Sequence, residues 1–270
     1  MTVAPRFSLG VEDRVAVVTG GSSGIGLATA RVLLAAGARV AICGRDASRL
    51  AEARAALAQT AGADRVLAER CDVLDAGAVE AFARAVEARL GPADILVNNA
   101  GQGRVSTFAD TTDEAWREEL ELKFFSVIRP TRAFLVQLER AGAGAIVCVN
   151  SLLARQPEPH MVATSAARAG ILNLTRSLAT EFAPQGVRVN MVLIGLVESG
   201  QWRRRYAAQA APGESWDAWT AGLARTKHIP LGRLGKPEEV AHAIAFLASP
   251  LASYTTGSFI DVSGGHSRHV

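Results

Sequence analysis

A glycine-rich segment near the start of the chain has the residue types and spacing of a phosphate-binding turn. Residues 19–26, with the sequence TGGSSGIG, follow the apolar run Val15–Val18 and precede the helix-like stretch Leu27–Ala36. A strand, a glycine turn and a helix start in this order offer unpaired backbone amides to negative charge, and glycine lets a pyrophosphate approach without a Cβ in the way. The flanking strand and helix favour a dinucleotide over the alternative, a glycine turn without a ligand. The residues expected to hold the phosphates are Gly20, Ser22, Ser23, Gly24, Ile25 and Gly26.

The composition indicates one large α/β domain. The 270 residues are 49% hydrophobic and 20% charged, so the chain can bury a large core. The 29 Lys and Arg residues exceed the 26 Asp and Glu residues only slightly and are spread along the chain, so we expect no nucleic-acid partner. Lysine is scarce, because only Lys123, Lys227 and Lys236 are present.

The three cysteines, Cys43, Cys71 and Cys148, are far apart and fall at or near expected strand ends. Without a short-spaced pair they predict buried thiols in a reducing compartment, and no metal site. Residues 1–14 hold no apolar stretch suited to a signal peptide, and no later run approaches the ~18 residues of a membrane span. We therefore expect a cytoplasmic protein with no membrane partner.

Apolar strand-like runs alternate with helical segments, which predicts a parallel sheet covered on both faces. The expected strands are Val15–Val18, Arg39–Cys43, Val66–Glu69, Ile95–Val97, Ala145–Val149, Val187–Val192 and Ser258–Val262. The expected helices include Ala47–Leu57, Ala76–Arg89, Trp116–Arg140, Val162–Phe182 and Pro237–Ala248. We expect residues 1–270 to form a single domain in which 198–230 is an insertion. Ligands of such a sheet bind beyond the carboxyl ends of its strands.

Several motifs together resemble the short-chain dehydrogenase/reductase family. They run from about residue 14 to residue 265 and comprise the segment 19–26, Asp72, Asn98-Asn99-Ala100-Gly101, Ser151, Arg188-Val189-Asn190, Pro237-Glu238-Glu239 and Asp261-Val262-Ser263-Gly264-Gly265. The resemblance implies a Rossmann-type, doubly wound, mostly parallel seven-stranded sheet with helices on both faces. It also implies a nicotinamide cofactor, a small-molecule substrate and a homotetramer or homodimer.

The resemblance assigns further residues to the cofactor. Asp72 is expected to bind the edge of the adenine ring, and residues 98–101 to brace the sheet beside the cofactor. The remaining residues expected to contact it are Val73, Asn99, Ala100, Gly101, Arg168 and Gly195.

Arg45 follows the second expected strand, where an acidic residue usually binds the ribose 2′-hydroxyl. A guanidinium there offers donors and charge to a 2′-phosphate, which favours NADP over NAD. The alternative is a solvated arginine that pairs with Asp46.

The chain departs from the family at the catalytic residues. The family moves a proton with a tyrosine and a lysine, aided by a serine and an asparagine, and only the serine is matched, as Ser151. Thr164 stands in the tyrosine position, Arg168 in the lysine position and Lys123 in the asparagine position. The pKa of an aliphatic hydroxyl lies far above the pKa of ~10 of a phenol. We therefore do not expect Thr164 to carry a proton. Arg168 can bind ribose hydroxyls but stays protonated.

Two residues are candidates for a substitute acid. Lys123 would face the catalytic centre near Arg168, and repulsion between the two cations would lower its pKa into a useful range. The alternative is an ion pair with Glu119 on the helix surface, four residues earlier. His160 is the second candidate, because histidine titrates in the right range. It can equally be an exposed loop residue.

Residues 198–230 form a lid over the substrate in the family. Trp216, Trp219 and Leu223 share one helical face, so they either cap an apolar pocket or pack a lid helix onto its own domain. The lid also holds Trp202, Tyr206 and the run Arg203-Arg204-Arg205, which leaves open an apolar substrate with an anionic group.

The sequence predicts an atypical NADP-dependent oxidoreductase that acts on an unidentified alcohol or carbonyl. The alternative is a catalytically inactive NADP-binding sensor or scaffold subunit that pairs with an active relative. The motifs of the cofactor site are compatible with both, since both bind the coenzyme. Turnover separates the two.

Overall fold

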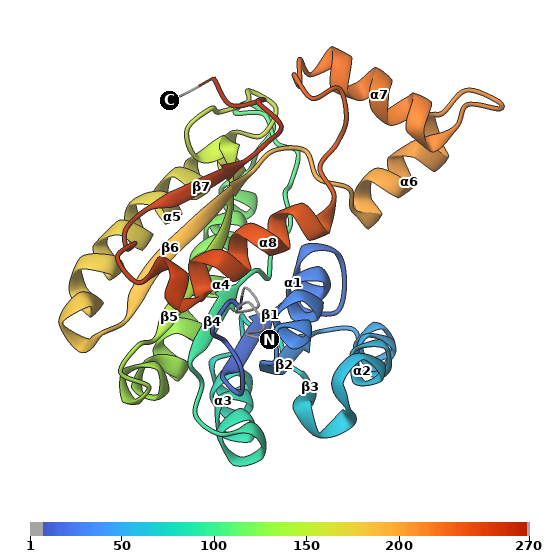
Figure 1. The fold of residues 1–270 in the computed structure, drawn as a ribbon. Helices are drawn as coiled ribbons and strands as arrows, with labels where there is room; N and C mark the ends of the chain where they lie inside the picture. Colours follow the sequence, from blue (N-terminus) through green and yellow to red (C-terminus); the bar gives the residue numbers. More distant parts are fainter. Residues whose placement is uncertain (1–7, 269–270) are drawn as a thin grey trace.

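A single sheet of seven parallel strands forms the centre of the molecule (Figure 1). The computed structural model describes residues 8–268. The strand order is β3-β2-β1-β4-β5-β6-β7, and every neighbouring pair is parallel. The strands are β1 (Val15–Thr19), β2 (Arg39–Gly44), β3 (Val66–Arg70), β4 (Ile95–Asn98), β5 (Ala145–Ser151), β6 (Arg188–Ile194) and β7 (Phe259–Val262). The predicted Rossmann-type sheet is confirmed, and it is parallel throughout rather than mostly parallel.

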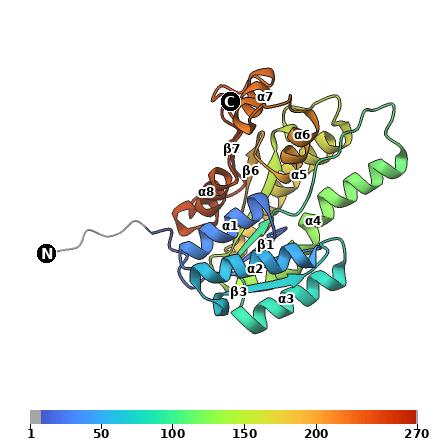
Figure 2. The ribbon, with the colours of Figure 1, turned by 90° about the vertical axis from the view of Figure 1, so that its right-hand side faces the viewer.

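The helices cover both faces of the sheet. They are α1 (Gly24–Ala35), α2 (Ala47–Ala61), α3 (Ala76–Leu90), α4 (Asp113–Arg140), α5 (Val162–Phe182), α6 (Gly200–Gln209), α7 (Trp216–Thr226) and α8 (Pro237–Ala248). Short 3-10 turns occupy η1 (Ala63–Arg65), η2 (Leu152–Ala154), η3 (Ala183–Gln185) and η4 (Pro250–Ala252). Side chains of α1, α2 and α8 pack on one face, and those of α3, α4 and α5 pack on the other. Figure 2 shows α1 and α8 on one side of the sheet and α3 and α4 on the opposite side.

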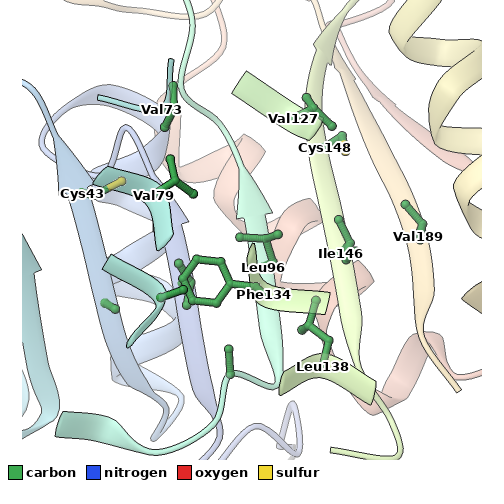
Figure 3. Packing of buried hydrophobic residues seen from close by; sticks show 14 of the residues in the cluster. Cys43, Val73, Val79, Leu96, Val127, Phe134, Leu138, Ile146, Cys148 and Val189 are labelled. Carbon is green, nitrogen blue, oxygen red and sulfur yellow. The ribbon is translucent and has the colours of Figure 1, made fainter. Parts of the chain in front are cut away.

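The two faces of the sheet carry two apolar layers. In the layer under α3, α4 and α5, Phe134 is fully buried (Figure 3). It meets Phe82 edge to face, with 5.8 Å between ring centroids. Leu96, Ile146 and Val189 extend this layer across β4, β5 and β6. Because parallel strands are covered on both faces, their side chains are apolar in nearly continuous runs. This packing holds α4 and α5 rigidly beside the carboxyl ends of β4 and β5.

The three cysteines are free and buried, as the sequence predicts. Cys148 lies in the same apolar layer, and burial raises the pKa of its thiol to about 11.

Among the described residues 8–268, no helix is long and apolar enough to cross a membrane.

Helices α6 and α7 lie within the insertion that the sequence marks at 198–230. They follow β6 and stand apart from the two helix layers (Figure 1). Each begins at a serine whose side chain accepts a hydrogen bond from the helix, Ser199 for α6 and Ser215 for α7. The sequence predicts an insertion here, and the two serine caps divide it into two separate helices.

Candidate functional site

The glycine turn between β1 and α1 is shaped for close approach. Gly20 and Gly24 have positive φ values of 64° and 52°, which only glycine adopts readily. A Cβ on Gly26 would lie 2.3 Å from the carbonyl oxygen of Gly20, and a Cβ on Gly21 would lie 2.5 Å from Ile42. The turn therefore leaves no room for a side chain at Gly21 or Gly26, because Gly26 packs on the turn's own backbone and Gly21 on Ile42.

The start of α1 is free of a side-chain cap. Ser23 is the N-cap residue in an extended conformation, and its hydroxyl makes no capping hydrogen bond to the helix. The backbone amides of the first helical turn therefore receive no cap from Ser23. Such amides are suited to the oxygens of a phosphate.

Residues after β4 fix the glycine turn in place. Thr19 Oγ1 accepts hydrogen bonds from the backbone amides of Asn99, at 3.0 Å, and Ala100, at 3.1 Å. Asn99 Nδ2 in turn donates to the carbonyl oxygens of Thr19, at 2.9 Å, and Gly20, at 3.1 Å. These hydrogen bonds join the ends of β1 and β4.

The structure brings the expected cofactor residues to the carboxyl-end edge of the sheet. Gly195 follows β6, where a Cβ would lie 2.9 Å from Ser263. Asp72 follows β3, and its carboxylate accepts from the backbone amide of Leu74 at 3.0 Å. The expected cofactor residues in the loops of this edge or in the first turn of α1 are Gly20, Ser22, Ser23, Gly24, Ile25, Gly26, Arg45, Asp72, Val73, Asn99, Ala100, Gly101 and Gly195.

Arg45 does not pair with Asp46. The Asp46 carboxylate caps α2 by accepting from the Arg49 amide at 3.0 Å, and it pairs with Arg49 Nε at 2.9 Å. Among the ion pairs of residues 8–268, none includes Arg45. The alternative of an Arg45–Asp46 pair is wrong, and the Arg45 guanidinium at the end of β2 is available to a ligand.

Arg168 is hydrogen-bonded to the end of β5, the strand whose last residue is Ser151. Arg168 Nη1 donates to the carbonyl oxygen of Val149 at 3.0 Å, and Asn150 Nδ2 donates to the carbonyl oxygen of Arg168 at 3.0 Å. Ser151 Oγ accepts from the backbone amide of Leu153 at 3.3 Å. Burial lowers the pKa of Arg168 to about 10, so its guanidinium stays charged at neutral pH. Its Nε is buried and has no hydrogen-bond partner.

Lys123 and Glu119 form a buried ion pair. Lys123 Nζ lies 2.7 Å from Glu119 Oε1, and each side chain is only 3% exposed. Lys123 Nζ also donates to the carbonyl oxygen of Gln102 at 2.6 Å. The alternative of an ion pair with Glu119 is therefore right about the partner but wrong about the surface location. The packing of α4 places this turn of the helix inside the protein.

The pKa of Lys123 lies below its ordinary value. Burial is the largest cause, and the positive charge of Arg168 adds to it. Glu119 opposes both effects through its hydrogen bond and its charge, while Arg104 lowers the pKa further. Both the expected Lys123–Arg168 repulsion and the Glu119 contact are thus present.

Thr164 belongs to the same cluster. Its hydroxyl donates to the Glu119 carboxylate, and its Oγ1 accepts from the backbone amide of Arg104 at 3.3 Å. Thr164 and Glu119 come from α5 and α4, so their hydrogen bond joins the two helices. We refer to Glu119, Lys123, Thr164 and Arg168 as the buried charged cluster.

The sequence reasoning did not assign Glu119 to the site. The helical spacing indicates that Glu119 is buried, because it lies on the same face of α4 as the buried residues Ser126, Val127 and Pro130. An acidic residue on an apolar helical stripe has to find a partner inside the protein.

His160 is separate from the buried charged cluster. Its side chain is 51% exposed, and its Nδ1 lies 3.7 Å from Glu158 Oε2. Its backbone carbonyl accepts from Ser106 at 2.9 Å. The structure therefore places His160 in an exposed loop position, and its catalytic role stays a prediction.

Within the chain, neither tyrosine lies beside Ser151 in the position of the missing phenol. The Tyr206 hydroxyl donates to the carbonyl oxygen of Glu214 at 2.5 Å, within the insertion. Tyr254 is fully exposed and precedes β7, at the amino-end edge of the sheet, whereas Ser151 lies at the carboxyl-end edge.

The aromatic residues of the insertion pack on one another. Trp216 and Trp219 stack with 5.9 Å between ring centroids, and Tyr206 meets both rings edge to face. The Arg203 guanidinium lies 3.6 Å from the centre of the Trp216 ring, which is a cation–π contact. These contacts join α6 to α7, so at least part of this aromatic surface forms the core of the helix pair.

Comparison with known proteins identifies similar chains of nearly equal length. A family model described as enoyl-(acyl carrier protein) reductase matches residues 20–267. A short chain oxidoreductase from Pseudomonas aeruginosa PAO1 containing an atypical catalytic center, solved with NADPH bound, is 69% identical and superposes with a TM-score of 0.92 over 97% of this chain and 99% of its own. L-sorbose reductase from Gluconobacter frateurii, complexed with NADPH and L-sorbose, is 34% identical, with a TM-score of 0.92 over 98% of this chain and 100% of its own.

A curated relative is similarly close in length. Cis-4-hydroxycyclohexanecarboxylate dehydrogenase from Sinomonas cyclohexanicum is 40% identical over 255 residues, which are 94% of this chain and 96% of the relative.

Proposed function

This chain belongs to the short-chain dehydrogenase/reductase family, and we propose that it is an NADP(H)-dependent oxidoreductase that interconverts a small-molecule carbonyl and an alcohol. Lys123 serves as the proton donor in place of the tyrosine of the family. The observation that carries this proposal is the buried Lys123 beside Arg168, with a lowered pKa. The protein acts in the cytoplasm as a homodimer or homotetramer, with residues 198–230 as its substrate lid.

The residues present fit a phosphorylated nicotinamide coenzyme. The turn at residues 20–26 has the close backbone contacts and the uncapped helix start that a pyrophosphate requires. The unpaired Arg45 offers charge to a 2′-phosphate, and the orphaned Nε of Arg168 is a donor for a ribose hydroxyl. When bound, the coenzyme supplies or accepts the hydride. Two relatives with NADPH in their structures support the same cofactor.

The residues of the chain supply the proton and stabilise the oxygen. A lysine ammonium has three N–H donors, and two of those of Lys123 are used by Gln102 and Glu119. The third is assigned to the substrate oxygen, which becomes an alcohol when the proton is transferred. The O–H of Ser151 orients the same oxygen. The charge of Arg168 stabilises the alkoxide that develops as hydride reaches the carbonyl carbon.

A panel experiment tests this function. The purified protein is titrated with NADPH and NADH, and carbonyls and alcohols are then screened by the absorbance of the nicotinamide. Turnover with NADPH or NADP supports the proposal. Binding without turnover over a wide panel would support the inactive sensor or scaffold instead.

Arg45→Ala tests the choice of coenzyme. Loss of one charge-assisted contact of about 1.5–3 kcal/mol is expected to weaken NADPH binding by about 10- to 100-fold. NADH lacks the 2′-phosphate, so its Kd is expected to stay the same. Calorimetric titration with both coenzymes measures the two effects, and an equal loss for both would contradict a 2′-phosphate contact at Arg45.

A further inference from the structure

We propose that Glu119 is a positioning residue that holds the Lys123 ammonium in place for its role as the acid, and that Thr164 fixes the Glu119 carboxylate in this contact. This inference rests on the proposed function, since it concerns the acidity of the group assigned to donate the proton. It gives the side chain in the tyrosine position a role that does not need ionisation.

The charged groups with the largest effects on Lys123 are one carboxylate and two guanidinium groups. Glu119 lies on its own helix at 2.7 Å, Arg168 faces it from α5, and Arg104 faces it from the loop before α4. Two cations and burial therefore favour the neutral amine, and one carboxylate favours the ammonium. Without Glu119, the charges of Arg168 and Arg104 would both work against protonation of Lys123.

The position of Glu119 differs from that of an ordinary helix ion pair. Both partners are 3% exposed, so neither charge is compensated by bulk water. A buried ion pair is weak evidence for stability, because an apolar pair of similar size is often equally stable. A contribution to the position and charge of the Lys123 ammonium accounts for the pair better than a contribution to the stability of the fold.

Thr164 provides the second contact of the carboxylate. Its hydroxyl donates to the Glu119 carboxylate and so fixes the carboxylate from α5. The Arg104 backbone amide donates to the same Oγ1 at 3.3 Å, which fixes the hydroxyl oxygen. Thr164 thus acts on Lys123 through Glu119, without carrying a proton itself.

Glu119→Gln tests the inference through the pH profile of carbonyl reduction. A general acid must be protonated, so activity is lost as the pH rises through the pKa of Lys123. Removal of the carboxylate charge lowers that pKa, and the alkaline limb of kcat/KM is expected to shift to lower pH by ~1–3 units, as expected for one close opposite charge. Glu121→Gln is the matched control, because Glu121 is on the same helix but is 52% exposed and pairs with Arg129.

A second substitution pair separates positioning from packing. Thr164→Ser retains the hydroxyl and is expected to retain the wild-type pH profile. Thr164→Val retains the shape but not the hydroxyl, and is expected to shift the alkaline limb in the same direction as Glu119→Gln, by less. If Thr164 had only a structural role, Thr164→Val would lower activity equally at all pH values and leave the alkaline limb of the pH profile in place.

The outcomes distinguish this inference from the proposed function. If Lys123→Met is inactive while Glu119→Gln leaves the alkaline limb unchanged, the role of Glu119 is wrong and that of Lys123 stands. If Lys123→Met keeps full turnover, the proposed catalytic role of Lys123 fails first.

The strand register also points to a second residue for coenzyme choice, and we infer that Arg70 joins Arg45 at the 2′-phosphate. This inference rests on the proposed coenzyme. Arg70, at the end of β3, is in register with Gly44 at the end of β2, and its Nε donates to the carbonyl oxygen of Arg45 at 3.2 Å. Both guanidinium groups are exposed, and the described residues provide neither with an ion-pair partner. Two adjacent unpaired cations favour a doubly charged anion over a ribose hydroxyl.

Arg70→Ala is expected to weaken NADPH binding about fivefold, as for one exposed ionic contact, with no change for NADH. Arg49→Ala is the control, because Arg49 is engaged with Asp46. An unchanged NADPH affinity in Arg70→Ala, together with a loss in Arg45→Ala, would overturn the role of Arg70 alone. No loss in either variant would overturn the coenzyme assignment as well.

Discussion

Lys123→Met is expected to lower kcat for carbonyl reduction by about 100- to 10,000-fold, the usual contribution of a general acid. The Kd for NADPH is expected to stay close to that of the wild type, because the glycine turn and Arg45 lie in other loops and Arg168 keeps its hydrogen bond to the carbonyl oxygen of Val149. Lys236→Met is the matched control, since Lys236 is exposed at the start of α8. Full turnover in Lys123→Met would contradict the assignment.

Stability requires a second variant in this experiment. Lys123→Met leaves the Glu119 carboxylate buried without its cation, and breaking a buried pair costs about 3–5 kcal/mol of folding free energy. The double variant Glu119→Leu/Lys123→Met removes both charges and is expected to unfold at nearly the wild-type temperature. It is expected to be as inactive as the single variant, so loss of activity can be separated from loss of fold.

Gly26→Ala is expected to weaken NADPH binding by about 10- to 100-fold. The new Cβ would meet the Gly20 carbonyl at 2.3 Å and Asn99 Nδ2 at 2.5 Å, and both atoms are held by the hydrogen bonds that fix the turn. The turn must shift, at a cost of about 1–3 kcal/mol. Calorimetric titration with NADPH gives the Kd.

A glycine elsewhere in a helix provides the control. In α7, the nearest atom to a Cβ on Gly222 is an Arg225 side-chain nitrogen at 3.8 Å. Gly222→Ala is therefore expected to leave NADPH binding unchanged and to stabilise α7 slightly. Equal coenzyme affinity in Gly26→Ala and the wild type would show that this turn does not bind the pyrophosphate.

Much of the fold is predictable from apolar periodicity. The helices Val162–Phe182 and Pro237–Ala248 have the predicted bounds. The strands β2, β4 and β5 extend one or two residues further than predicted, to Gly44, Asn98 and Ser151. Their last residues are glycine or polar because they form the site edge, so the apolar runs end before the strand pairing does. α4 begins three residues earlier than predicted because Thr112 caps it.

The environment of the candidate site is less predictable. An acidic and a basic residue four apart on a helix are typical of a solvated surface, and only the packing of α4 against α5 places Glu119 and Lys123 inside. The contact of Asp46 is different, because its position before α2 is that of an N-cap residue. That local pattern predicts that its carboxylate is already occupied, which leaves Arg45 unpaired.

The assignment of Lys123 as proton donor is tested most directly by the single-turnover rate of NADPH oxidation. The measurement compares the wild type with Glu119→Leu/Lys123→Met at saturating coenzyme and carbonyl substrate. The expected rate is at least about 100-fold lower in the double variant, with the NADPH Kd unchanged. A rate within a few-fold of the wild type in the folded, coenzyme-bound double variant would contradict this assignment.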